Sequence, residues 1–364
     1  MELSRKLQEV CKQFRIEDTF VGYETIQMGN VNRTYKVNFR LADGSPKSFL
    51  VQNVNTYAFR NPVGLMENID KVTEHIRAKC PGQTSLHFHH TVERKTYLID
   101  GENFWRMTNY IPSVTYNTVQ DPQILRNAGM AFGEFQTHLA DFDIAQLTET
   151  IPDFHNTRMR YEHLISAVRE DKAGRVPEVQ AEIDYLLSVQ DMACRLTDMQ
   201  KAGELPLRVT HNDTKINNVL FHPENRSALV VIDLDTVMPG LIGHDFGDAI
   251  RFAANFVEED CPETEKVGVD LDVFRSFAEG FLAKTADTLT EKEAETLALS
   301  CFVLTAELCT RFLADYIEGD PYFNIKYPDH NLVRTRCQIA LAKDMQKKMG
   351  QMEAIVRSCI AAAK

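Results

Sequence analysis

Two Asp-Gly pairs in the first 110 residues, Asp43-Gly44 and Asp100-Gly101, constrain the fold of this chain more than any other feature. Each pair lies between runs of β-branched and aromatic residues, a setting typical of a tight hairpin turn. A helix is predicted after Asn61-Pro62, because Asn is a preferred N-cap and proline suits the first helical turn. The first part of the chain is therefore expected to be a small antiparallel sheet that carries one helix. The predicted hairpins join residues 34–40 to 48–54 and residues 96–99 to 104–111.

After Pro112 the pattern becomes mainly helical. Asp121-Pro122 repeats the cap-and-proline signal, and Thr290-x-x-Glu293 is a capping box before an apolar helix. We therefore expect an α+β fold with a β-rich lobe over residues 1–110 and a mainly helical lobe over residues 111–364. Within the second lobe, further helices are predicted over residues 177–196 and from about 332 to the C-terminus, and short strands at 207–210, 219–222 and 228–233.

The composition excludes several classes of protein. The chain has 364 residues, with 52 acidic and 40 basic side chains, and its formal net charge is −12. This charge argues against general nucleic-acid binding, which depends on clustered cations. No apolar run in the sequence reaches the roughly 20 residues that span a bilayer, so no membrane association is expected. The eight cysteines are dispersed and form no CxxC pair, which favours a reducing, cytoplasmic location.

The most informative segment is VTHNDTKINN at residues 209–218, where a polar loop joins two short predicted strands. Phosphoryl transfer needs a carboxylate that deprotonates the attacking hydroxyl, a cation near the γ-phosphate, and carboxylate and amide oxygens that hold Mg²⁺. Asp213 would be the base and Lys215 the cation. Asn218 and Asp233 would be the metal ligands, since Asp233 ends the apolar strand that follows. This order, H-x-D-x-x-x-x-N with a later strand-terminal Asp, matches the catalytic loop of kinases.

Two other interpretations of these residues are considered. An isolated polar turn whose side chains bond to their own backbone would explain one Asp, but not the ordered set. The run Asp233-Leu-Asp235-Thr also resembles the nucleophile motif of haloacid-dehalogenase-like phosphatases, with Asp245 and Asp248 as a later acidic pair. That chemistry needs an alternating strand–helix sheet, whereas the sequence after Gly240 has the pattern of helices.

Three neighbouring features are assigned supporting roles. His211 is expected to brace the loop, because a base is already present. Asp245 and Asp248 open a helix, where carboxylates can accept hydrogen bonds from free amides and clamp the catalytic loop. The segment 28–32, between two strands, lies where a phosphate-covering hairpin would be, although it contains only one glycine.

With these motifs identified, the sequence resembles the aminoglycoside-phosphotransferase-like branch of the kinase fold, and within it the N-acetylhexosamine 1-kinases. The likeness runs nearly end to end, and the last two of its clearest blocks are the most specific. The blocks are Val209–Asn218, Ile232–Gly240, Asp245–Phe252, Arg311–Asp320 and Lys326–Arg336.

The resemblance implies a bilobal protein-kinase-like fold and the phosphorylation, by ATP with Mg²⁺, of the anomeric hydroxyl of N-acetylglucosamine or N-acetylgalactosamine. An anomeric hydroxyl is more acidic than an ordinary alcohol, so a carboxylate such as Asp213 suffices as base. The resemblance also implies a nucleotide site and a sugar site. The nucleotide site would include Gly29, Gln52, Asn109 and Ile111, and the sugar site Asn30, Phe252, Arg311 and Tyr322.

The sequence departs from the general kinase pattern on its third strand. A protein kinase has a lysine there, whereas this chain has Gln52, which contributes no charge, so another cation or more metal must compensate. Three alternatives to the sugar kinase remain: a kinase of the same fold for an amino alcohol, aminoglycoside or other sugar, a nucleotide-binding protein without turnover, and the phosphatase. An arginine in the acceptor site favours a neutral or oxygen-rich acceptor over a cationic one.

Overall fold

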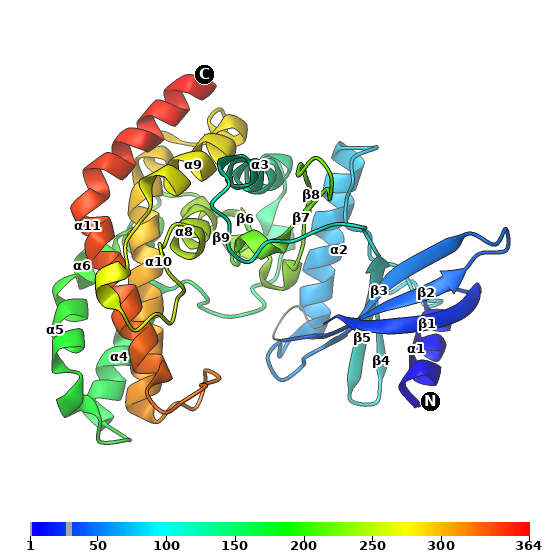
Figure 1. Cartoon of the computed structure of the whole chain (residues 1–364), viewed down its shortest axis with the longest axis horizontal. Helices are drawn as coiled ribbons and strands as arrows, with labels where there is room; N and C mark the ends of the chain where they lie inside the picture. The colour runs from blue at the N-terminus through cyan, green and yellow to red at the C-terminus, as the bar shows by residue number, and fades with distance from the viewer. Residues whose placement is uncertain (1, 27–30) are drawn as a thin grey trace.

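The computed structural model describes residues 2–26 and 31–364. A five-stranded antiparallel sheet with the order β1-β2-β3-β5-β4 occupies the N-terminal part, which confirms both predicted hairpins. In Figure 1 the sheet lies on one side, most helices lie on the other, and α2 lies between them. The strands are β1 (Thr19–Ile26), β2 (Arg33–Arg40), β3 (Pro46–Val54), β4 (Tyr97–Asp100) and β5 (Asn103–Asn109), with helices α1 (Glu2–Gln13) and α2 (Pro62–Lys79).

The two faces of the sheet have different partners because side chains alternate along a strand. On β3 and β5 the odd-numbered residues, such as Val51 and Met107, pack with Leu7 and Phe14 at α1 in one apolar cluster. The even-numbered Phe104 belongs to the main core of the molecule, together with residues of α2 and of the helical part. The residues that share this second face, including Gln52 and Arg106, therefore point toward the rest of the chain.

The C-terminal part is mainly helical and contains two short antiparallel pairs, β6 with β9 and β7 with β8. Their bounds are β6 (Arg208–Thr210), β7 (Val219–Phe221), β8 (Ala228–Val231) and β9 (Met238–Gly240). The helices are α3 (Pro122–His138), α4 (Thr157–Glu170), α5 (Gln180–Ser188), α6 (Gln190–Ala193), α7 (Arg195–Lys201), α8 (Ile242–Ala253), α9 (Leu271–Thr285), α10 (Glu291–Glu318) and α11 (His330–Ala363), with short 3₁₀ turns such as η3 (Ile216–Asn218) and η4 (Leu234–Thr236).

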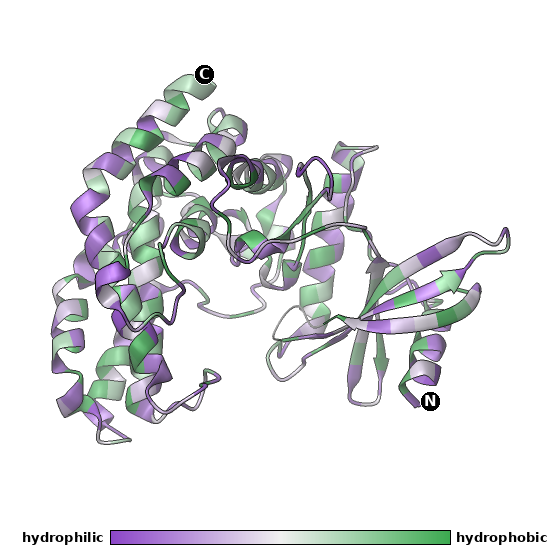
Figure 2. Cartoon of the chain, viewed as in Figure 1, coloured by the Kyte–Doolittle hydropathy of each residue, from purple (hydrophilic) through white to green (hydrophobic). Residues whose placement is uncertain are grey.

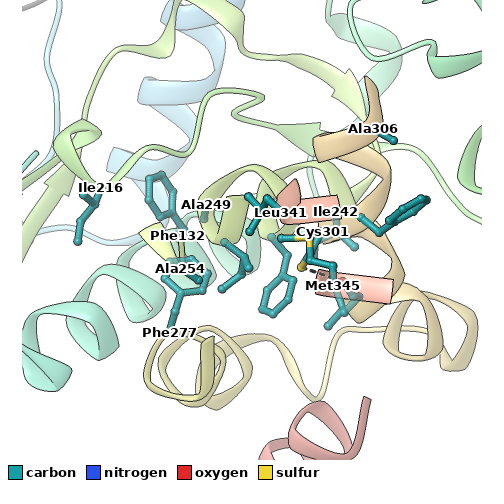
Figure 3. Close-up of a cluster of buried hydrophobic side chains, with 14 of the residues drawn as sticks. Phe132, Ile216, Ile242, Ala249, Ala254, Phe277, Cys301, Ala306, Leu341 and Met345 are labelled. Carbon is teal, nitrogen blue, oxygen red and sulfur yellow. Dashed lines mark hydrogen bonds between the residues drawn. The ribbon is translucent and has the colours of Figure 1, made fainter. Parts of the chain in front are cut away.

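The core of this part surrounds α8. Figure 3 shows Phe132 of α3, Phe277 of α9, Cys301 of α10 and Leu341 of α11 gathered near α8. Burial of these side chains fixes α8, and with it the acidic residues at its N-terminal end, against the β6 loop.

Helix α10 begins at the predicted capping box. Thr290 Oγ1 accepts from the Glu293 amide at 3.2 Å, and a Glu293 carboxylate oxygen accepts from the Thr290 amide at 2.8 Å. Among the described residues, α10 is the one helix long and apolar enough to cross a membrane, but 83% of its most apolar window is buried in the fold, as in a core helix. The outer helix α11 alternates polar and apolar residues along its length in Figure 2.

The prediction of one helix over residues 177–196 is wrong. The chain instead forms the separate helices α5, α6 and α7, with breaks at Val189 and Cys194. Both break residues are buried, and all three short helices contact α10. Because each short helix contacts α10, we attribute the breaks to packing against that helix, which overrides the helical periodicity.

Candidate active site

The loop after β6 is held by buried hydrogen bonds. A carboxylate oxygen of Asp245 accepts from the backbone amide of His211 at 3.0 Å and the other from that of Asn212 at 2.8 Å. Asp248 accepts from the amide of Thr214 at 3.1 Å. The predicted clamp of the helix α8 carboxylates on the loop is therefore confirmed. Burial raises the pKa of Asp245, and Gln136 Nε2 donates to it at 2.6 Å.

His211 has the predicted bracing role. Its ring is fully buried against the Phe132 and Phe135 rings, with centroid distances of 5.7 and 5.9 Å. Nε2 lies 2.8 Å from the carbonyl oxygen of Ile232, which connects the β6 loop to the end of β8. The ring therefore links the two segments that carry the proposed catalytic and metal-binding residues.

Three of the predicted site residues contact one another in this loop. Lys215 Nζ lies 2.8 Å from Asp213 Oδ1. Asn218 Nδ2 donates to the Asp213 carbonyl oxygen at 2.8 Å and to Oδ2 at 3.3 Å. Burial alone would lower the pKa of Lys215, but the carboxylates of Asp213 and Asp248 outweigh burial and raise it. Lys215 is therefore protonated and positively charged. The Asp213 side chain is 28% exposed, so its carboxylate is reached by solvent.

The fourth predicted residue, Asp233, lies just beyond β8 with a left-handed backbone (φ 61°). Solvent reaches its side chain, yet the surrounding protein still desolvates the carboxylate. This desolvation, together with the charges of Asp235 and Asp213, raises the pKa of Asp233 to about 6. A divalent cation bound at Asp233 would relieve this repulsion between carboxylates.

Asn218 and Asp233 offer an amide oxygen and a carboxylate, the donor types that suit Mg²⁺. The amide nitrogen of Asn218 is committed to Asp213, which leaves its oxygen as the atom that can bind a cation. In the part of the chain that the structure describes, no group of three or more His, Cys, Asp or Glu side chains could hold a metal. Mg²⁺ at phosphate sites is usually held by one or two protein groups together with the phosphates themselves, so this pair fits it.

The neighbouring Asp235 has a different environment. It is buried, forms an ion pair with Arg106 of β5, and accepts from Asn32 Nδ2 at 2.6 Å. Both oxygens of its carboxylate are thus committed to the N-terminal sheet region rather than to a metal. The antiparallel strand pairs and the run of helices after Gly240 also exclude the phosphatase interpretation, which requires an alternating strand–helix sheet.

The predicted nucleotide-site residues lie along the sheet and its exit. Gln52 is on β3, where its Nε2 donates to Thr34 Oγ1 at 3.1 Å. Asn109 ends β5 and is exposed, and Ile111 follows in the segment that leads to the helical part. Gly29 lies outside the described residues, as does Asn30 of the predicted sugar site.

The structure brings two of the predicted sugar-site residues together. The Arg311 guanidinium, on α10, lies 6.0 Å from the Tyr322 ring centroid and 5.4 Å from that of Phe323. Asp315 accepts from the backbone amides of Tyr322 and Phe323 at 2.8 and 3.0 Å and so fixes the turn that follows α10. The Tyr322 side chain is 73% exposed and free to contact a ligand. The remaining predicted residue, Phe252, packs partly buried against the main core near the end of α8.

Sequence reasoning missed several residues that connect these parts. Glu307, one turn before Arg311 on α10, lies 2.9 Å from His155 Nδ1, and His155 Nε2 lies 3.3 Å from the Asn212 carbonyl oxygen. This chain of contacts links the region of Arg311, part of the predicted sugar site, to the loop after β6. Arg160 of α4 donates to the Phe154 carbonyl at 2.8 Å, and burial, with a smaller effect of the Arg311 charge, lowers its pKa. No local sequence signal marks these pairs, because their members are far apart in the chain.

Comparison with known proteins gives a consistent result. The model of the phosphotransferase enzyme family matches residues 24–271. A microcompartment-associated aminopropanol kinase has a similar structure, with a TM-score of 0.64 at 14% identity over 95% of this chain and 98% of that chain. A spectinomycin phosphotransferase in complex with ADP and spectinomycin gives a TM-score of 0.58 at 13% identity, covering 96% and 98%. A choline kinase from Cryptosporidium parvum Iowa II gives a TM-score of 0.56 at 13% identity, over 98% of this chain and 99% of that chain. This chain therefore belongs to the phosphotransferase enzyme family.

Proposed function

We propose that this protein is a small-molecule kinase that uses ATP and Mg²⁺, and that its acceptor is the anomeric hydroxyl of N-acetylglucosamine or N-acetylgalactosamine. The observation that carries the kinase proposal is the contact set around Asp213, in which Lys215 and Asn218 both touch its carboxylate. The fold, shared with small-molecule kinases, supports the same conclusion.

The proposed reaction follows from these positions. The Asp213 carboxylate accepts the proton of the acceptor hydroxyl, and the resulting oxygen forms a bond to the γ-phosphorus while the bond to the ADP oxygen breaks. Lys215 stabilises the negative charge on the transferred phosphoryl group. Mg²⁺, held by Asn218 and Asp233, would supply charge neutralisation on the phosphates. The Asp245 and Asp248 clamp keeps the loop in one geometry, which reduces the reorganisation that the reaction requires.

The charge on the acceptor side favours a neutral, oxygen-rich acceptor. Arg311 lies over the rings of Tyr322 and Phe323, and its guanidinium disfavours an ammonium or aminoglycoside cation at this surface. The same group can donate several hydrogen bonds to sugar hydroxyls and to an N-acetyl carbonyl. The exposed ring of Tyr322 offers an apolar face against which a pyranose ring can pack. These features support the sugar proposal over the amino-alcohol and aminoglycoside alternatives.

The acceptor class is tested by measuring ADP release with ATP and Mg²⁺ in the presence of a panel of acceptors. The panel contains the two N-acetylhexosamines, glucose, galactose, choline, ethanolamine and an aminoglycoside. The proposal predicts that kcat/KM is highest for the N-acetylhexosamines and that it falls in Arg311→Met. Preferred turnover of a cationic acceptor would support another kinase of the same fold instead.

The cysteines and the net charge bear on the cellular compartment and the partner of the proposed enzyme. All eight cysteines are free, and six of them are buried, which suits a reducing compartment such as the cytoplasm. The net charge of −12 gives no basis for a nucleic-acid partner, so a small-molecule sugar is the proposed partner.

A further inference from the structure

A row of polar side chains crosses the inner face of the sheet. Thr34, Gln52 and Arg106 are register partners on β2, β3 and β5, so their side chains lie next to one another on one face. Gln52 Nε2 donates to Thr34 Oγ1 at 3.1 Å, and Arg106 Nε donates to Gln52 Oε1 at 2.9 Å. Gln52 thus holds the guanidinium of Arg106 in a fixed orientation.

The row continues into the helical part of the chain. Arg106 Nη1 pairs with Asp235, 129 residues later, and both side chains are only 3% exposed. Asp235 also accepts from Asn32 Nδ2 at 2.6 Å, and Asn32 Oδ1 accepts from the Asn55 amide at 2.9 Å. The row is therefore fixed at both ends, to the start of β2 and to η4.

This arrangement holds a buried cation beside the proposed phosphate site. Asp235 is two residues from Asp233, the proposed metal ligand, so its partner Arg106 lies next to the segment proposed to hold Mg²⁺ at the phosphates. Gln52 and Asp235 engage Nε and Nη1 of the guanidinium, and Met66 Sδ lies 3.9 Å from Nη1, so among the described residues Nη2 is the nitrogen without a hydrogen-bond partner. Burying a guanidinium costs free energy unless partners compensate. Gln52 and Asp235 are these partners, and they fix the guanidinium at this position.

We propose that Arg106 binds the α- and β-phosphates of ATP, supplying from β5 the positive charge that the third strand lacks. In protein kinases a lysine on the third strand provides this charge and is held by a carboxylate. Here the third strand carries the neutral Gln52 in direct register with Arg106, and Asp235 is the carboxylate that holds the cation. The inference rests on the proposed kinase function and deepens it by naming a phosphate-binding residue.

Equilibrium binding of Mg·ATP, AMP and adenosine, measured by calorimetry without acceptor, tests the proposal. Loss of one charge-assisted contact predicts that R106Q binds Mg·ATP about 10- to 100-fold more weakly, while adenosine binding changes less than about twofold because it has no phosphate. The double variant Q52K/R106Q, which returns a cation to the third strand, should recover most of the Mg·ATP affinity. R40Q, which removes an exposed cation from the end of β2, should bind like the wild type.

The outcomes separate this inference from the kinase proposal. If R106Q binds Mg·ATP as tightly as the wild type, or loses affinity for adenosine and ATP equally, Arg106 is only a structural tie between the sheet and η4, and the inference is wrong. If the wild type itself does not bind Mg·ATP, the kinase proposal fails and the inference with it. R106Q leaves the Asp235 carboxylate buried without its charged partner and could fail to fold for that reason. In that case the comparison of D235N with D235N/R106Q gives the same test, because neither variant contains this carboxylate.

Discussion

The side-chain amide of Asn218 donates to the backbone carbonyl of Asp213 at 2.8 Å and to its carboxylate at 3.3 Å. The proposed metal ligand thereby orients the proposed base. Together with Lys215 on the other carboxylate oxygen, this contact sets the direction in which Asp213 can accept a proton.

Replacement of Asp213 by Ala is expected to lower kcat by about 10²- to 10⁴-fold, because a positioned general base contributes that much. The melting temperature should change little, since the loop is held mainly by Asp245 and Asp248. Steady-state kinetics and a thermal melt of the same preparation give both values. A variant with near-normal turnover would remove Asp213 from the mechanism.

Replacement of Asp233 by Asn is expected to raise the Mg²⁺ concentration needed for half-maximal activity by at least about tenfold, because a charged metal ligand becomes neutral. Titration of activity with Mg²⁺ at constant ATP checks this. Asp235→Asn serves as the comparison: it removes the partner of Arg106, so at saturating ATP it is expected to change the Mg²⁺ requirement less than Asp233→Asn does. If Asp235→Asn shifts the Mg²⁺ requirement more than Asp233→Asn does, the metal ligand has been assigned to the wrong carboxylate.

The close approach of α3 and α9 depends on glycine. A Cβ atom at Gly280 would overlap the Arg126 carbonyl oxygen, whereas at Gly350 of α11 it would meet nothing within 4 Å. Gly280→Ala is therefore expected to lower the free energy of unfolding by about 3 kcal/mol. Gly350→Ala should raise it by about 0.5–1 kcal/mol, because alanine is the better helix former. Urea denaturation of the two variants measures the contrast, and equal effects would contradict the packing described for α3 and α9.

The buried His155–Glu307 pair predicts a pH-dependent stability. Burial alone would lower the pKa of His155, but the Glu307 carboxylate outweighs burial and raises it. For Glu307, burial would raise the pKa, but the His155 charge and the hydrogen bonds lower it to about 2. The histidine contribution is complete below its ordinary pKa and is lost as the pH rises through the raised value. The carboxylate contribution is complete above its ordinary pKa and is lost as the pH falls toward 2.

Thermal melts of the wild type and of His155→Gln across pH 4 to 9 test this. The variant should be less stable by about 3–5 kcal/mol near pH 6, because it leaves a buried carboxylate without its charged partner. The difference should shrink as the pH rises. A difference that stays constant across this range would show that the pair is neutral in the folded protein.

Local sequence signals predicted the turns and helix ends whose conformation depends only on neighbouring residues. Gly44 has φ 84° in the turn between β2 and β3, and the Ser45 amide bonds to Asp43, so this turn depends on neighbouring residues alone. The Thr290 capping box is also local. The catalytic loop was predictable because its residues share one short segment, and the structure brings Asp213, Lys215 and Asn218 into contact. Their catalytic and metal-binding roles remain predictions.

The long-range contacts could not be predicted in this way. Arg106 and Asp235 are 129 residues apart and Glu307 is 152 residues from His155, so each pair meets only after the helices and sheet have packed. The break at Val189 likewise depends on packing against α10. These contacts are the ones that tie the catalytic loop to the sheet and to the region of the predicted sugar site.

The product formed from N-acetylglucosamine, ATP and Mg²⁺, observed by phosphorus NMR, tests the central claim most directly. We expect a sugar 1-phosphate, identified by coupling of its phosphorus to the anomeric proton, and no product from the methyl glycoside, which lacks the anomeric hydroxyl. Phosphorylation of the methyl glycoside, or coupling to protons at another carbon, would contradict the assignment.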